Sequence, residues 1–225
     1  NSPQDLTTIT LRLDHNIFRS LVPRGGSVPA EMTDGMVITR LAVNGEAADL
    51  PAGPGAGGGR GRGGAAPAGQ RRLSASGLDQ TVARISLAAP IASKTTATLE
   101  IAWHTKLPGG QGSGHRMTQR FEDRLFQPTQ WYPRVAMYDD LRGWDTNPYL
   151  GPAEFYNNFG RFDVRMDVPG GWIVSGTGVL QNPQEVLTAT ARDRLSHVLE
   201  SDDVITIVGD DEVGPGQATA PGDRL

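Results

Sequence analysis

The sequence contains no cysteine, and this absence excludes disulfide bonds, thiolate zinc ligands and a cysteine nucleophile. No stretch approaches the roughly 18 apolar residues that a membrane-spanning helix needs. No charged segment followed by an apolar one opens the chain, as a secretory signal would. Basic residues are outnumbered, with 21 lysines and arginines against 25 acidic residues and a formal charge of -4. This balance argues against a general nucleic-acid or membrane-surface binder.

Several catalytic motifs are missing too. The chain has four scattered histidines, at His15, His104, His115 and His197. None belongs to the helix-borne His-Glu-x-x-His motif of zinc peptidases, so each is interpreted as a surface or structural residue. No Gly-x-Ser-x-Gly nucleophile motif occurs, and neighbouring aspartate pairs are interpreted as turn formers. The sequence therefore predicts no catalytic residue and no metal ligand. The chain alone is expected neither to bind zinc tightly nor to cleave aminoacyl substrates.

What the sequence does have is a succession of strand patterns. Apolar and polar residues alternate, or form short apolar runs, over residues 8–14, 36–43, 46–50, 81–87, 95–105, 162–168, 172–180 and 204–208. Asn44-Gly45, the strongest short hairpin signal, joins the second and third of these. Short, turn-rich gaps between strands are typical of antiparallel β folds. The predicted fold is all-β, an antiparallel sandwich or saddle-shaped domain with one short helix.

Two segments interrupt the strands. A helix capped by Thr188 or Thr190 is expected to end near Glu200, and its apolar stripe would consist of Leu195, Val198 and Leu199. Residues 51–70 are almost entirely Gly, Ala, Pro and Arg, a composition that buries too little apolar area to offset the entropy of ordering. We interpret them as a flexible insertion within one domain that spans residues 1–225, rather than as an RNA-binding arginine-glycine segment or a phosphate loop.

Residues 126–150 are the region richest in aromatic and polar side chains together. Aromatic residues interleaved with polar ones suit the wall of a cleft, where flat rings shape a pocket and polar groups orient a ligand. The same composition suits an aromatic cluster that pins a long loop onto a sheet. Composition leaves both interpretations open.

A family resemblance is carried by this region. The central run is Gln127-Pro128-Thr129-Gln130-Trp131-Tyr132-Pro133-Arg134, followed by Tyr138-Asp139, Gly143-Trp144, Pro148-Tyr149-Leu150, Glu154-Phe155-Tyr156, Phe162-Asp163-Val164 and the stretch from Gly176 to Pro183. It resembles a bacterial branch of the aminopeptidase N family of gluzincin zinc metallopeptidases. The likeness covers nearly the whole chain apart from residues 51–70.

The resemblance implies a fragment of a longer enzyme: an N-terminal, saddle-shaped β domain that packs on a thermolysin-like catalytic domain of the same polypeptide. The zinc ion, its ligands and a glutamate general base would belong to that catalytic domain, and the substrate would be a peptide. In the family, a Thr-Gln or Ser-Gln segment of the N-terminal domain reaches the subsite for the substrate's amine. Gln130 matches that position, with Trp131 and Tyr132 beside it. Family habit also implies export to the periplasm or the cell exterior.

Two other functions stay open at this stage. The chain could be a non-enzymatic adhesion or ligand-binding β-sandwich whose aromatic loop stacks on a carbohydrate, or a purely structural scaffold domain. An His-Glu-x-x-His motif with a downstream glutamate in the continuing reading frame would distinguish the peptidase from both.

Overall fold

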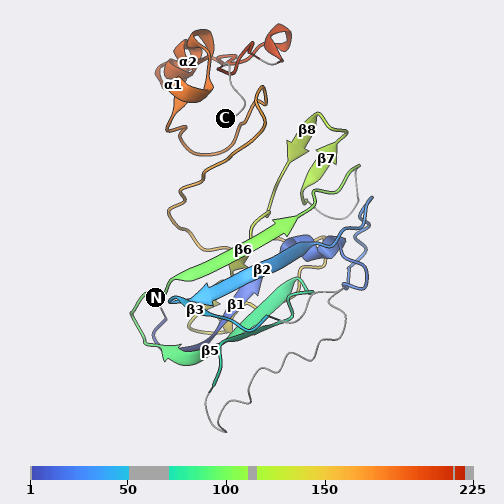
Figure 1. Cartoon of the computed structure of the whole chain (residues 1–225), viewed down its shortest axis with the longest axis vertical. Helices are drawn as coiled ribbons and strands as arrows, with labels where there is room; N and C mark the ends of the chain where they lie inside the picture. The colour runs from blue at the N-terminus through green and yellow to red at the C-terminus, as the bar shows by residue number, and fades with distance from the viewer. Residues whose placement is uncertain (1, 51–70, 111–115, 215, 221–225) are drawn as a thin grey trace. The chain divides into compact units, whose positions relative to one another are not determined.

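The computed structural model describes residues 2–50, 71–110, 116–214 and 216–220. The chain divides into two compact units, Asn1–Phe159 and Gly160–Leu225, and each is described by itself. The predicted insertion at residues 51–70 and His115 lie outside the described residues. Within the described part, antiparallel strands dominate and a single α-helix exceeds four residues (Figure 1). The β-rich, antiparallel character predicted from the sequence is confirmed.

The first unit contains two larger sheets. One has the order β4-β5-β1-β9, made of β4 (Ser74–Ser76), β5 (Val82–Ile91), β1 (Leu6–Arg12) and β9 (Arg134–Val135). The other has the order β3-β2-β6, made of β3 (Glu46–Ala47), β2 (Met36–Val43) and β6 (Leu99–Thr105). Two small ribbons complete it, β7 (Gln119–Phe121) with β8 (Leu125–Gln127) and β10 (Tyr138–Asp139) with β11 (Gly143–Trp144).

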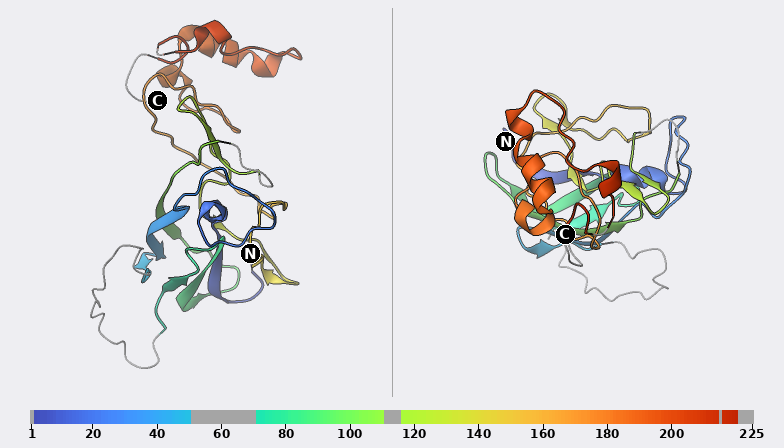
Figure 2. Two further views of the ribbon diagram at one scale, coloured as in Figure 1. Left: turned by 90° about the vertical axis from the view of Figure 1, so that its right-hand side faces the viewer. Right: turned by 90° about the horizontal axis from the view of Figure 1, so that it is seen from above.

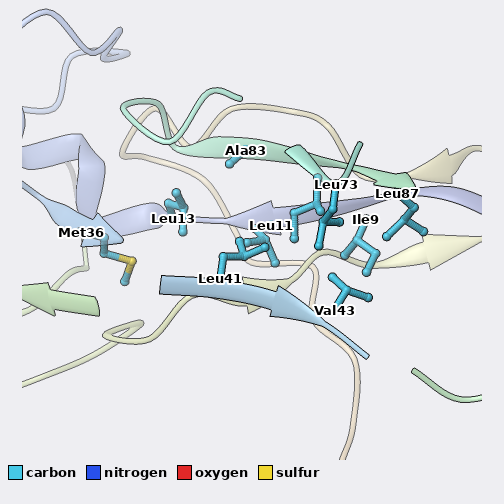
Figure 3. Packing of buried hydrophobic residues seen from close by; sticks show 10 residues of the cluster. Ile9, Leu11, Leu13, Met36, Leu41, Val43, Leu73, Ala83 and Leu87 are labelled. Carbon is cyan, nitrogen blue, oxygen red and sulfur yellow. The ribbon is translucent and has the colours of Figure 1, made fainter. Parts of the chain in front are cut away.

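A single hydrophobic cluster is shared by the two larger sheets. Leu11 of β1, Leu41 of β2 and Leu87 of β5 are buried members of it, and Figure 3 shows the side chains of these strands pointing toward one another. Each such side chain contributes about 1.5–3 kcal/mol when it leaves water. The apolar face of the predicted alternation is therefore the face that holds the two sheets together.

The predicted hairpin forms between β2 and β3. Asn44 has φ 51° and Gly45 has φ 82°, and positive φ at both central residues is the mark of a type I′ turn, whose twist matches that of the flanking strands. Residues 36–43 form β2 with the predicted bounds, whereas the strand expected at 46–50 shortens to two residues.

Strand β1 differs from its prediction because Ile9–Arg12 are buried on both faces. Thr10 and Arg12, on the face predicted to be polar, are buried together with Ile9 and Leu11. In the plane of the sheet, β1 pairs with β5 at one edge and with β9 at the other. The strand ends at Arg12, and Asp14–Phe18 form a 3-10 helix, η1, in place of the end of the predicted strand. All five residues of η1 are buried, and it appears in dark blue in Figure 2.

The second unit contradicts three strand predictions. Residues 162–168, 172–180 and 204–208 form no strand in the part that the structure describes. Phe162 and Val164, expected to point into a core, are 63% and 58% exposed. Alternation specifies which face of a strand would be buried, but a strand also needs a neighbour for its backbone N–H and C=O groups. No strand among the described residues supplies that neighbour.

The helix prediction is confirmed in part. Helix α1 (Pro183–Val186) precedes α2 (Ala189–Ser196), and the Thr188 hydroxyl accepts a hydrogen bond from the Ala191 backbone N at 3.4 Å. The expected apolar stripe is wrong. The α-helix ends at Ser196, so Val198 and Leu199 lie in the 3-10 turn η2 (Val198–Glu200), where Leu199 is 96% exposed. The buried helical residue is Ala191; another 3-10 turn, η3, spans Asp210–Glu212.

Candidate functional site

Gln130 lies in the loop that joins β8 to β9, and its backbone is unusual. Its φ is 52°, in the left-handed region that non-glycine residues other than Asn, Asp and His rarely adopt. Its side chain is half-buried and forms no hydrogen bond within the part of the chain that the structure describes. Residues held in such conformations cost about 1–3 kcal/mol and cluster at functional sites. The residue singled out by the resemblance thus has a strained backbone and an amide available to a ligand.

The chain immediately before Gln130 is fixed by two buried side chains. The backbone N of Thr129 donates to Oγ1 of Thr118 at 2.8 Å, and its carbonyl oxygen lies 2.8 Å from Nε2 of His15. His15 and Thr118 are both fully buried. A carbonyl oxygen only accepts hydrogen bonds, so Nε2 of His15 must carry the proton. Thr129 therefore has both of its backbone polar groups bound to side chains of the protein interior.

The loop is fixed on its other side by a buried charge network. Arg134 of β9 donates to Asp14 and to Asn157. Arg12 donates to the other oxygen of Asp14 at 3.2 Å and to Asp145 at 3.1 Å. The Asp14 carboxylate is fully buried between the two guanidinium groups. Gln130 is consequently held on a loop whose two flanks are anchored to η1 and β1.

Three aromatic side chains lie together where the chain continues from Gln130, and we call them the aromatic group: Trp103, Trp131 and Tyr132. The Trp131 ring centroid lies 6.0 Å from that of Trp103 on β6 and 5.4 Å from that of Tyr132, the latter pair edge to face. Trp131 keeps 37% of its surface exposed. Together with the Gln130 amide, these residues offer hydrogen bonding and exposed aromatic surface, which can orient a ligand.

The polar residues outside this loop include two histidines, His104 and His197, interpreted from the sequence as surface or structural residues. Within residues 2–50, 71–110, 116–214 and 216–220, no three His, Asp or Glu side chains are grouped so that they could hold a metal ion. His104 lies exposed on β6. His197 lies exposed at the end of α2, where its hydrogen bond to the Asp193 carbonyl raises its pKa. None of the helices in these ranges is long and apolar enough to span a bilayer.

Sequence reasoning placed Gln130, Trp131 and Tyr132 together, and the structure keeps them in one loop. His15, interpreted from the sequence as a surface or structural residue, and Thr118, to which sequence reasoning assigned no role, fix the backbone at Thr129. Trp103 lies within the strand predicted over residues 95–105, and its ring is half-buried against Trp131. The position of Trp103 near the end of that strand was the one signal that could have suggested a contact outside the core.

Comparisons with family models, with curated proteins and with solved structures found no match to this chain. The resemblance to the aminopeptidase N family therefore rests on the motifs quoted above. What the structure adds is the geometry of the loop that carries the most specific of those motifs, including the positive φ at Gln130.

Proposed function

We propose that this chain is the non-catalytic N-terminal β domain of a zinc-dependent aminopeptidase-like enzyme. It would pack on the catalytic domain of the same polypeptide and line the end of the cleft that receives the substrate's free amine. In this proposal the two larger sheets, which share one core, are the two layers of a saddle-shaped sandwich. Zinc would activate the attacking water in the catalytic domain. The described residues of this chain do not fit a zinc site, and we assign them no step through the metal.

The observation that carries the proposal is the state of Gln130. An amide oxygen can accept a hydrogen bond from a protonated amine without adding a charge to the site. Here the amide is unbonded within the described chain, and its backbone is held in a left-handed conformation between anchored flanks. Trp131, the next residue, is 37% exposed, and an aromatic ring attracts an ammonium group. The two groups together fit the N-terminus of a peptide.

Gln130→Ala in the longer enzyme is expected to lower kcat/KM roughly ten- to a hundredfold for peptides with a free amine. The loss corresponds to one hydrogen bond to a charged group, about 1.5–3 kcal/mol. Zinc content and folding should not change, because alanine retains a Cβ and leaves the cost of the left-handed backbone nearly the same. Steady-state kinetics and thermal unfolding on the same preparation measure both quantities.

Glu122→Ala is the matched control for that variant. Glu122 is an exposed residue in the β7–β8 turn with the same φ of 52°. Its replacement tests a truncation at this backbone angle, with the added loss of an exposed ion pair to Arg124 at 3.8 Å that contributes at most about 1 kcal/mol. We expect its kcat/KM to equal that of the unmodified enzyme. If Gln130→Ala lowers the melting temperature while kcat/KM per folded molecule stays normal, Gln130 is a structural residue and the amine-binding role is wrong.

A second candidate function is favoured by the exposure of Trp131. A tryptophan that is 37% exposed and supported by Trp103 and Tyr132 can stack on a sugar ring. The chain would then be a carbohydrate-binding or adhesion domain rather than part of an enzyme. Titration of the isolated chain with oligosaccharides, followed by tryptophan fluorescence, distinguishes the two. Saturable binding lost in Trp131→Ala and retained in Gln130→Ala favours the second candidate.

A further inference from the structure

We propose that His15 is the positioning residue for Gln130, and that it holds the site in its binding geometry only while its imidazole is neutral. The ligand in question, a peptide amine, rests on the function proposed above. The positioning itself rests on the contacts of His15, which lies on η1, distant in sequence from the loop.

A single peptide unit links His15 to Gln130. The carbonyl of Thr129 and the N–H of Gln130 belong to the same planar peptide group. A hydrogen bond that fixes the Thr129 oxygen therefore also fixes the orientation of that plane, from which the rotation φ about the N–Cα bond of Gln130 is measured. His15 Nε2 provides that bond at 2.8 Å. The Thr118 hydroxyl lies farther from the same oxygen, at 3.4 Å. His15 is therefore the principal donor that holds the peptide before Gln130.

His15 is itself rigidly placed. Its ring is fully buried, meets Phe18 edge to face with centroids 5.7 Å apart, and has Nδ1 3.4 Å from Oγ1 of Thr105 at the end of β6. With Nε2 protonated, Nδ1 carries the lone pair and can accept from the Thr105 hydroxyl. The neutral tautomer with the proton on Nε2 can therefore hydrogen-bond to Thr105 on β6 and to Thr129 on the loop, while its ring packs against Phe18 on η1.

A second ring proton would introduce a charge into this interior. The groups that face the ring from β6, the loop and η1, namely Thr105, Thr129 and Phe18, are uncharged. Among the described residues, the one charged neighbour that acts on it is Asp14, which is already bound by Arg12 and Arg134. Burial lowers the pKa of His15 below its usual 6.5, and the Thr129 hydrogen bond and the Asp14 charge oppose this without reversing it.

The sign of the pH dependence follows from that direction. An unfolded or released His15 binds a proton more readily than the folded one. The contribution of neutral His15 to holding the loop is therefore fully present above about pH 6.5. It declines as the pH falls through that value toward the lower pKa of His15 in the folded state. We expect the loop to be released at acidic pH and held at neutral pH.

His15→Leu and His15→Gln form the test pair, since leucine removes the donor and glutamine retains an N–H at similar reach. In the longer enzyme, His15→Leu should lower kcat/KM roughly tenfold with Gln130 present and less than about twofold in a Gln130→Ala background. His15→Gln should recover part of the loss. Equal effects of His15→Leu in both backgrounds would mean a general structural role and would overturn the proposal.

An NMR titration of this chain tests the positioning without any enzymatic activity. The ring nitrogens of His15 should titrate with a midpoint below 6.5, and the backbone amide of Gln130 should shift with the same midpoint, an effect absent in His15→Leu. A Gln130 amide that does not follow the His15 titration overturns the positioning role, whatever the kinetics show. If the amide follows it but the longer protein hydrolyses no peptide, the proposed function fails and the positioning stands.

Discussion

Replacement of Asp14 by alanine is expected to lower the free energy of unfolding by about 3–5 kcal/mol, because it leaves the buried Arg134 guanidinium without its counter-charge and leaves Arg12 with Asp145 alone. The Asp14 side chain is fully buried, and those of Arg12 and Arg134 are only 10% and 9% exposed. Urea unfolding of the two proteins side by side measures the difference, with the slope m checked for constancy.

The control for this variant is Asp123→Ala. Asp123 also pairs with an arginine, Arg120 at 2.8 Å, but its side chain is 90% exposed, and such pairs contribute at most about 1 kcal/mol. Similar losses in the two variants would contradict the claim that the Asp14 network is a buried, stabilising feature of the first unit.

Asn16→Ala is expected to destabilise the protein by a comparable amount, about 3–5 kcal/mol. Its fully buried amide donates to the carbonyls of Leu78 and Gln80 at 3.0 and 2.8 Å and accepts from the Met36 backbone N at 2.8 Å. Alanine would leave three backbone groups without this partner, at about 1–3 kcal/mol each before relaxation or entry of water. Equilibrium unfolding measures the loss.

An exposed asparagine provides the comparison for that variant. Asn182 makes one side-chain hydrogen bond, to Glu185 at 3.0 Å, on the surface of the second unit. Asn182→Ala should change stability by less than about 1 kcal/mol. If Asn16→Ala is equally mild, the three hydrogen bonds of Asn16 are not what joins η1 to the neighbouring turns.

Three consecutive residues of η1 therefore bind segments of the first unit that surround the candidate site or support it. Asp14 holds Arg134 on β9, His15 holds the peptide before Gln130, and Asn16 holds the turn before β5 and the first residue of β2. Because each of the three side chains reaches a different segment, the geometry of the Gln130 loop and the stability of the unit depend on the same short helix.

The strands of the first unit were predictable because alternation is a local signal. Residues 36–43 became β2 unchanged, and Asn44-Gly45 turned as expected, since both features depend on neighbours in sequence. η1 was not predictable. Its polar residues are buried by partners as distant in sequence as Arg134 and Thr129, so a local reading of Asp14-His15-Asn16 favours a loop.

The three strands wrongly predicted in the second unit have a different cause, the lack of a strand to pair with. Residues 162–168 carry a clear alternation but form no strand in the described part of the chain, because pattern alone supplies no hydrogen-bonding neighbour. At the site, composition indicated the region 126–150, and the resemblance indicated Gln130 with Trp131 and Tyr132 beside it. The positive φ of Gln130 could not be predicted from the sequence, since glutamine has no preference for that conformation.

Peptide hydrolysis by the longer polypeptide, in which the proposed catalytic domain follows this chain, decides whether the proposed function is right. Zinc content and kcat/KM would be measured with one peptide in two forms, with a free amine and with an acetylated amine. We expect bound zinc, hydrolysis of the free-amine form, and a preference for that form that falls roughly ten- to a hundredfold in Gln130→Ala. A downstream sequence without His-Glu-x-x-His, or a preference that Gln130→Ala leaves unchanged, would contradict it.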